Sequence, residues 1–153
     1  RILQQLQLDA SLSNQALAER CHLTPPTCLR RVRRLQQLGL IERTVAILGA
    51  DALRQHTGAG LTAIVEVTLD LQAEERQTAF EALAVQEPAV QQCYRTSPGP
   101  DFVLIITLAD MPAFMAVSQR LFSQQANVRN VRSFFSLRRA KFGSSLPLPL
   151  AEG

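Results

Sequence analysis

The sequence lacks the features that mark membrane, secreted and metal-dependent proteins. No apolar run reaches the roughly 18 residues of a membrane span, and the N-terminus shows no signal-peptide pattern. The three cysteines, Cys21, Cys28 and Cys93, are an odd number with no CxxC pair, which argues against a disulfide framework and a zinc site. We therefore expect a cytoplasmic globular protein with no membrane partner, no metal and no cofactor, in which the cysteines are small buried hydrophobic residues.

Histidine is also scarce. Neither His22 nor His56 has a second histidine or a carboxylate at the spacing of metal ligands or of a catalytic triad. No histidine lies between Leu61 and Leu137, so the second half lacks the commonest general acid-base group. We predict no catalytic residue, and hence a protein that is not an enzyme.

Positive charge is concentrated at the N-terminal end. The net charge is only +3, but residues 1–43 carry seven arginines against three acids, whereas the remainder carries nine bases against ten acids. This asymmetry is expected when one module contacts a polyanion and the other does something else. The surplus is modest, so a dimer would be needed to double the cationic footprint.

The stretch from Leu23 to Gly39 predicts a single helix with one apolar side and one cationic side. Thr24 can cap its first turn, Pro25 suits the first helical position, and Gly39 suits a left-handed C-cap. At about 100° per residue, the positions divide between two sides. The apolar side holds Cys28, Leu29, Val32 and Leu35, and the opposite side holds Thr27, Arg30 and Arg34, with Arg31 and Arg33 at the flanks.

Two shorter helical patterns precede this helix. The first, near Ile2 to Leu8, begins so close to Arg1 that we expect native residues before it; the second can be capped by Ser13 and ends at the turn 21–23. Helix, short turn, helix is the helix-turn-helix unit, whose second helix enters the DNA major groove. Because arginine can bond two acceptors at once on a guanine edge or a phosphate, the pattern favours double-stranded DNA binding over a merely solvated basic face.

Position within this motif predicts which residues contact DNA, because residues near the N-terminus of the recognition helix reach deepest into the groove. We expect Thr27, Arg30 and Arg31 to contact base edges. We expect Arg33, Arg34 and Ser13 mainly to hold phosphates. Pro26 belongs to the same predicted surface.

The second half predicts a ferredoxin-like domain in an α+β protein. Strands are expected near residues 61–69, 90–96, 102–108 and 128–138, with helices over 74–85 and 110–125, which gives the order βαββαβ. A β-branched run at residues 40–48 predicts one further strand. We therefore expect a helix-turn-helix domain at 1–42, a linker with a strand at 43–60, the ferredoxin-like domain at 61–142 and a tail at 143–153.

Two features of this half indicate self-association. Ile64 and Phe134 lie on the minority face of their strands, so a second subunit is expected to cover that face of the sheet. The tail from Ser144 to Leu150 contains two prolines and cannot extend the sheet. It is apolar enough that we expect it to lie on a neighbouring subunit.

With these motifs in place, the chain resembles the leucine-responsive regulatory protein and AsnC family of transcription regulators. Residues 17–20, 23–35 and 39–41 are similar to the family's helix-turn-helix signature. Cys93-Tyr94, Asp101-Phe102, and Asp110-Met111 followed by Phe114 are similar to its effector-domain landmarks. One departure is that the family usually has Thr-Gly before the aspartate of this loop, where the chain has Ser97-Pro98 and a glycine at position 99.

The resemblance implies a winged or extended helix-turn-helix domain, a ferredoxin-like effector-binding domain, and a homodimer that assembles to a tetramer or octamer. It also implies control by a small molecule, usually an amino acid, that alters oligomerisation or DNA affinity. Two alternatives stay open. One is an architectural protein that compacts DNA without effector control, and the other is a tetrapyrrole decarboxylase of similar architecture.

The candidate effector site comprises Tyr94, Ser97, Gly99 and Asp101. An α-amino acid needs amide donors for its carboxylate, an acidic acceptor for its ammonium and a pocket for its side chain. The loop can offer backbone N–H groups from residues 97, 99 and 101, and the Asp101 carboxylate can receive the ammonium, whereas its two prolines cannot donate. The alternative is that Asp101 only caps the turn into the following strand. If the loop binds an effector, we expect a moderately apolar amino acid between subunits.

Overall fold

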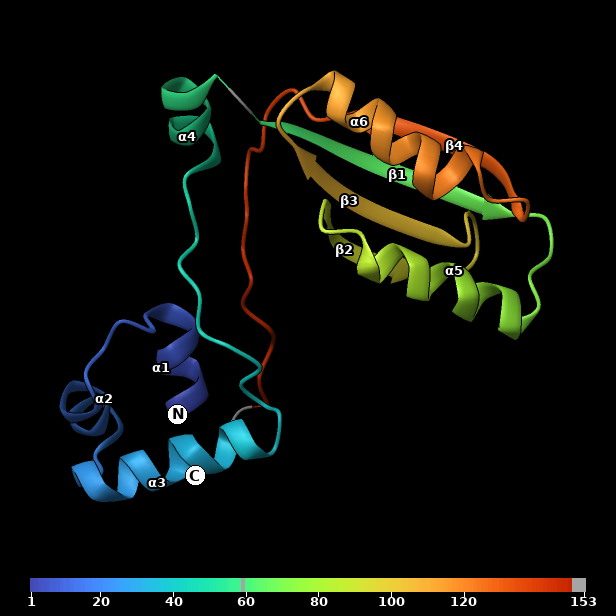
Figure 1. The fold of residues 1–153 in the computed structure, drawn as a ribbon. Helices are drawn as coiled ribbons and strands as arrows, with labels where there is room; N and C mark the ends of the chain where they lie inside the picture. Colours follow the sequence, from blue (N-terminus) through green and yellow to red (C-terminus); the bar gives the residue numbers. More distant parts are fainter. Residues whose placement is uncertain (59, 150–153) are drawn as a thin grey trace. The chain divides into compact units, whose positions relative to one another are not determined.

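The chain folds into two compact units (Figure 1). The computed structural model describes residues 1–58 and 60–149. The first unit comprises residues 1–47 together with the chain from Ala140 onward, and the second comprises Leu48–Arg139. The tail thus groups with the N-terminal helices of its own chain, where the Leu146 backbone bonds to the Gln7 side chain. Its expected contact with a neighbouring subunit stays a prediction.

The first unit is the predicted three-helix module. It contains α1 (Ile2–Leu8), α2 (Asn14–Cys21) and α3 (Pro25–Gln37). The Ser13 hydroxyl caps α2 by accepting the Ala16 N–H at 3.1 Å, as expected. The helices share a small core formed by Ile2, Leu17, Ala18, Cys21 and Cys28, against which Val32 and Leu35 pack.

The two ends of α3 differ in how they are capped. At the C-terminus Gly39 has a φ of +70°, and the N–H groups of Gly39 and Leu40 donate to the carbonyls of Gln36 and Leu35, which is a Schellman ending. At the N-terminus the Thr24 side chain accepts no amide of the helix, so that part of the prediction was wrong. Its hydroxyl instead donates to the Thr27 hydroxyl at 2.9 Å.

The segment after α3 is not a strand, which corrects the expectation for residues 40–48. Among the described residues no other segment pairs with it in a ladder of backbone hydrogen bonds, and β-branched composition alone cannot supply one. Val45, Ile47 and Leu48 are therefore exposed. The chain then forms α4 (Ala50–Thr57) within the segment that was expected to be a linker, and α4 ends at Gly58 with a φ of +67°.

The second unit is a four-stranded antiparallel sheet with the order β2-β3-β1-β4. Its strands are β1 (Leu61–Leu69), β2 (Val90–Arg95), β3 (Phe102–Leu108) and β4 (Val128–Phe135). Besides α4, this unit contains the helices α5 (Glu74–Gln86) and α6 (Met111–Ser118), the latter continued by the π-helical turn η1 (Gln119–Ser123). The predicted ferredoxin-like order and the α+β class are confirmed.

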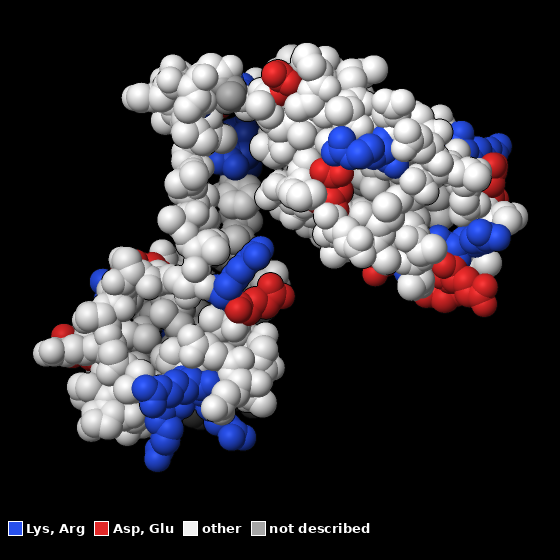
Figure 2. Space-filling view, viewed as in Figure 1, with Lys and Arg blue, Asp and Glu red and all other residues white. Residues whose placement is uncertain are grey.

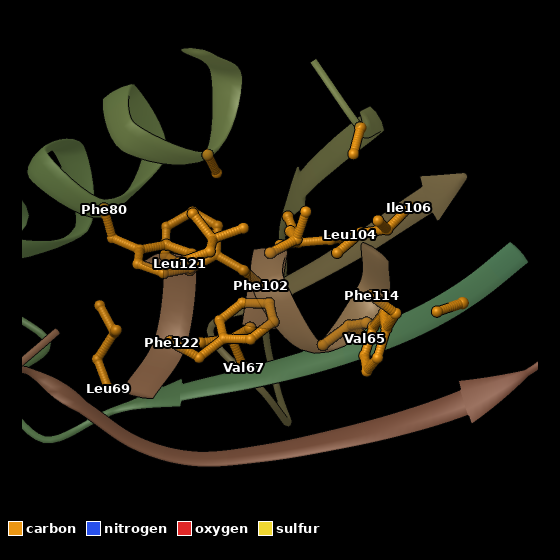
Figure 3. Packing of buried hydrophobic residues seen from close by; sticks show 14 residues of the cluster. Val65, Val67, Leu69, Phe80, Phe102, Leu104, Ile106, Phe114, Leu121 and Phe122 are labelled. Carbon is orange, nitrogen blue, oxygen red and sulfur yellow. The ribbon is translucent and has the colours of Figure 1, made fainter. Parts of the chain in front are cut away.

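The core of this unit lies between the helices and one face of the sheet (Figure 3). Alternate residues of β1 and β3 point into it, because successive side chains of a strand face opposite ways. The rings of Phe80 and Phe102 join helix and sheet with centroids 4.9 Å apart. The largest contributors are Val65, Val67, Leu69, Phe80, Phe102, Leu104, Ile106, Phe114, Leu121 and Phe122.

The opposite face of the sheet carries apolar side chains that no described part of the chain covers. Ile64 and Phe134 are 40% and 44% exposed, as their positions on the strands predicted. They are direct partners across the β1–β4 pair, and Ile105 lies opposite Ile64 on β3. An apolar row therefore crosses three strands on this face.

Candidate nucleic-acid interface and effector loop

The solvent-facing side of α3 is strongly cationic. Figure 2 shows arginine side chains gathered over this helix. Arg30, Arg31, Arg33 and Arg34 are all exposed and line one shallow groove with Pro26, Leu29 and Gln37. Within residues 1–58 and 60–149, no carboxylate lies within 4.0 Å of any of these four guanidinium groups. The helix thus presents four charges whose donors are free for an external anion.

One side chain of this helix lies differently from the prediction. Leu29 was expected on the core side, but it is 40% exposed and borders the arginine groove. The small core beneath α3 is filled by Cys28, Val32 and Leu35, which leaves no space for Leu29. The groove therefore has an apolar element suited to contact with a flat base edge or a methyl group.

The start of α3 is fixed by a contact that the sequence did not reveal. The Asn14 side-chain amide donates from Nδ2 to the Pro25 carbonyl at 2.9 Å, which joins the first turns of α2 and α3. Ser13, one residue earlier, is exposed and uses its oxygen as a cap acceptor, so its O–H proton remains available to a further acceptor. The only sequence signal for this contact is a polar side chain at position 14, directly after the expected cap residue Ser13.

The predicted effector loop is short and tightly closed. The Thr96 N–H donates to the Asp101 carbonyl at 2.9 Å, and the Thr96 hydroxyl donates to the Pro100 carbonyl. Ser97 and Gly99 are exposed at its tip, and Gly99 has a φ of +122° that favours glycine. The N–H groups of Ser97 and Gly99 donate to no acceptor within the described part of the chain. The loop therefore presents two free amide donors.

Asp101 lies at the base of the loop and is only 6% exposed. Its Oδ2 accepts the Leu69 N–H at 2.7 Å and lies 3.4 Å from Gln72 Nε2, while its own N–H donates to the Val67 carbonyl at 2.9 Å. These bonds tie the loop to the end of β1, thirty-two residues away in sequence. One oxygen of this carboxylate is thus committed to backbone, which gives Asp101 a structural role in the loop.

Tyr94 stands apart from the loop on β2. It is 53% exposed, and its hydroxyl donates to Gln92 Oε1 at 3.0 Å. The structure thus gathers Ser97, Gly99 and Asp101 in one loop, exposes the first two and buries the third. Tyr94 lies on the strand that leads into it.

The residue between Tyr94 and the loop anchors the other side of this region. The Arg95 guanidinium lies 2.8 Å from both Glu74 Oε1 and Glu81 Oε2 on α5, and 5.9 Å from the centre of the Phe102 ring. Hydrogen bonding and charge from Arg95 lower the pKa of the exposed Glu74 carboxyl. Sequence reasoning missed this cluster, although two acids seven positions apart on a helix share one face. The loop begins directly after this anchored arginine.

The described residues include no group of three histidine, cysteine or acidic side chains placed to hold a metal ion. Their helices include none that is both long and apolar enough to cross a bilayer. Cys21 and Cys28 are buried as expected, whereas Cys93 is partly exposed, and burial raises the pKa values of the Cys28 and Cys93 thiols.

Comparison with known proteins assigns each unit to a described domain. Residues 1–42 match a winged helix-turn-helix DNA-binding domain, and residues 62–146 match the Lrp/AsnC ligand binding domain. The chain is 30% identical to the DNA-binding transcriptional activator DecR of Escherichia coli (strain K12), over 97% of this chain and 95% of that protein. It is 33% identical to the leucine-responsive regulatory protein of Rhizobium meliloti (strain 1021), over 92% of this chain and 88% of that protein.

Solved structures agree with the sequence relatives. A transcriptional regulator of Neisseria meningitidis, determined as a complex with L-Met, superposes with a TM-score of 0.80 at 30% identity, covering 95% of this chain and 92% of that chain. An AsnC family transcriptional regulator of Agrobacterium tumefaciens has the same TM-score at 27% identity, with the same coverage. The chain belongs to the Lrp/AsnC family of DNA-binding transcriptional regulators.

Proposed function

We propose that this regulator binds specific operator sequences through the exposed face of α3 and responds to an amino acid held at the loop 96–101. The observation that carries the first part is the set of four unpaired, exposed arginines on the second helix of a helix-turn-helix unit. A helix of this diameter fits the major groove, and each guanidinium can bond two acceptors on a base or a phosphate. The absence of histidine between Leu61 and Leu137 disfavours a decarboxylase.

We assign the DNA contacts by their place along α3. Thr27, Arg30 and Arg31 lie in the first two turns, which enter a groove deepest, so they contact base edges, and Pro26 belongs to the same surface. Arg33 and Arg34 lie farther along and hold phosphates. The Ser13 hydroxyl, whose proton is not used by the cap, donates to another phosphate beside α2.

Selection from a random-sequence DNA pool tests sequence specificity. We expect enrichment of a near-palindromic motif, because a dimer places two recognition helices about one turn of DNA apart. The enriched duplex should bind at least about a thousandfold more tightly than a scrambled duplex at the same salt concentration. Equal affinity for both duplexes would instead support the architectural alternative.

The assembly follows from the uncovered face of the sheet. We infer that a second copy packs on the apolar row formed by Ile105, Ile64 and Phe134, because contiguous apolar side chains on a sheet face favour burial. Dimers formed in this way associate further to tetramers or octamers. Doubling the recognition helix also doubles the modest positive charge of one N-terminal unit.

The effector proposal rests on the two free amides of the loop and on the family's ligand-binding domain. The N–H groups of Ser97 and Gly99 receive the ligand carboxylate, Tyr94 lines the site, and Asp101 Oδ1 is the acceptor for the ammonium. A thermal-shift panel of the twenty amino acids tests this, since a ligand that binds only the native state raises its stability with concentration. L-Met is the first candidate, because a solved relative holds it. A panel in which no amino acid raises the transition temperature would contradict the proposal.

A further inference from the structure

The C-terminal tail is held on the helix-turn-helix unit by a reciprocal pair of hydrogen bonds. The Gln7 side chain on α1 donates from Nε2 to the Leu146 carbonyl at 3.1 Å, and its Oε1 accepts the Leu146 N–H at 2.6 Å. One primary amide thus satisfies both backbone groups of a residue 139 positions away. This is the pairing that a neighbouring strand would otherwise supply, and it fixes the tail in one register.

Beyond this pair the tail forms part of the wall of a largely apolar hollow in the same unit. Leu148 and Pro149 line the hollow together with Ile2 of α1 and Leu35 of α3. Leu148 is half-buried there. Pro147 and Pro149 have fixed φ angles, so the segment loses less conformational entropy when it is ordered than an ordinary tail would.

Two arginines connect this hollow to the proposed DNA-binding face. Arg31 and Arg34 line the hollow that holds the tail, and they also line the shallow basic groove on the outside of α3. Their side chains therefore form the ridge between the two. Because the tail encloses one side of this hollow, its order limits the space that these long side chains can occupy.

We propose that the tail is an intrachain strap that completes the DNA-binding unit, holding α1 against α3 and Arg31 and Arg34 in place for DNA. The effect of the tail on DNA affinity rests on the proposed contacts of these arginines with DNA. The effect of the tail on the stability of α1 does not depend on those contacts. Ordering a long side chain on binding costs free energy, so prior restriction of two arginines strengthens DNA binding by about tenfold. In this arrangement the arginines contact DNA, and the tail positions them.

The test compares two full-length variants with the same chemical change. Leu148→Ser removes the apolar contact in the hollow, and Leu137→Ser makes the same change at a side chain that is 93% exposed. Neither variant alters the charge near DNA. Hydrogen exchange of the α1 amides and the Kd for a selected duplex are measured for each.

We expect Leu148→Ser to speed exchange in α1 and to weaken DNA binding by about tenfold, with Leu137→Ser equal to the parent. Gln7→Met, which removes the hydrogen bonds at nearly constant volume, should act in the same direction as Leu148→Ser. If both Leu148→Ser and Gln7→Met leave α1 exchange unchanged, the strap is overturned. If they speed exchange but leave Kd unchanged, the positioning of the arginines is overturned.

A double-mutant cycle separates this inference from the proposed function. If the tail acts through Arg34, the combined variant Leu148→Ser with Arg34→Ala should bind DNA more tightly than the product of the two single losses predicts. If the two losses of DNA affinity simply multiply in the combined variant, the tail does not act through Arg34. If the parent protein binds no selected duplex, the DNA contacts assigned to α3 fail, while the exchange of α1 still decides whether the tail acts as a strap.

Discussion

Substitutions of Asp101 test how the effector loop is built. The structural role of Asp101 needs a hydrogen-bond acceptor, whereas its proposed ligand-binding role needs a negative charge. Its buried carboxylate accepts the Leu69 N–H at 2.7 Å. In Asp101→Ala that N–H would remain at the end of β1 without its acceptor. A hydrogen bond to a charged group contributes about 1.5–3 kcal/mol, and an unsatisfied buried donor costs about 1–3 kcal/mol.

These two magnitudes describe the same loss and are not added. We therefore expect Asp101→Ala to lower the free energy of unfolding by about 2–3 kcal/mol, which for a chain of this length lowers Tm by roughly 5–10 °C. Asp101→Asn keeps a carbonyl oxygen that can accept the Leu69 N–H but has no charge. Its loss should be about half as large, because neutral hydrogen bonds are roughly half as strong as charged ones.

Urea unfolding followed by circular dichroism measures both variants at one protein concentration, because the stability of an oligomer depends on concentration. Asp70→Ala is the control, since Asp70 is an exposed carboxylate directly after Leu69. It should stay within about 0.5 kcal/mol of the parent. If Asp101→Ala also stays within that range, the reasoning about the loop anchor is refuted.

The same variants decide whether Asp101 also contacts the ligand. Calorimetric titration of an active amino acid into Asp101→Asn isolates the charge, because the amide can hold Leu69 but offers no anion to an ammonium group. Lost binding in a variant of near-native stability would support the assignment of the ammonium to Asp101. Binding as tight as that of the parent would leave this residue with its structural role alone.

Three further predictions concern the rest of the chain. Arg31→Ala should cost about 1–3 kcal/mol on the selected duplex and flatten sequence preference, whereas Arg34→Ala should weaken all duplexes alike and lower the salt slope, both measured by fluorescence anisotropy. Ile64→Glu should dissociate the dimer at micromolar concentration in light scattering; a parent that is already a stable monomer would contradict this. Because Arg95 lowers the pKa of Glu74 below its usual 4.5, the stability that Glu74 contributes is present above that pH and lost as pH falls through the lowered value. The difference between the parent and Glu74→Gln in urea unfolding should therefore disappear at low pH.

The fold of the second unit was largely predictable, because its signals are local. Alternation in β1 placed Ala63, Val65, Val67 and Leu69 on one face, and these four are buried. The uninterrupted apolar run at Phe102–Leu108 gave β3 its observed bounds. The caps at Ser13 and Gly39 were also correct, since each depends only on a few neighbouring residues.

Predictions that depended on a partner segment were wrong. Residues 40–48 have the composition of a strand, but a strand needs a neighbour for its hydrogen bonds, and no segment of the described chain forms a backbone ladder with them. The period of α3 placed Leu29 inward, but the core of three short helices is too small to cover it. In both cases the sequence correctly indicated a local preference, for an extended segment or for one side of a helix. The outcome depended instead on which other segments were available to pack against it.

The two candidate sites differ in predictability for the same reason. The arginine face of α3 follows from the period of one helix, so residues within five positions define it without any other part of the chain. The effector loop depends on Leu69, thirty-two residues before Asp101, and on Glu74 and Glu81, which hold Arg95 beside it. Gln7 and Leu146 are farther apart still. An aspartate in a turn is therefore compatible with either a capping role or a ligand-binding role until its distant partner is known. Here the short hydrogen bond from the Leu69 N–H shows that the chain itself holds the loop in shape without a ligand.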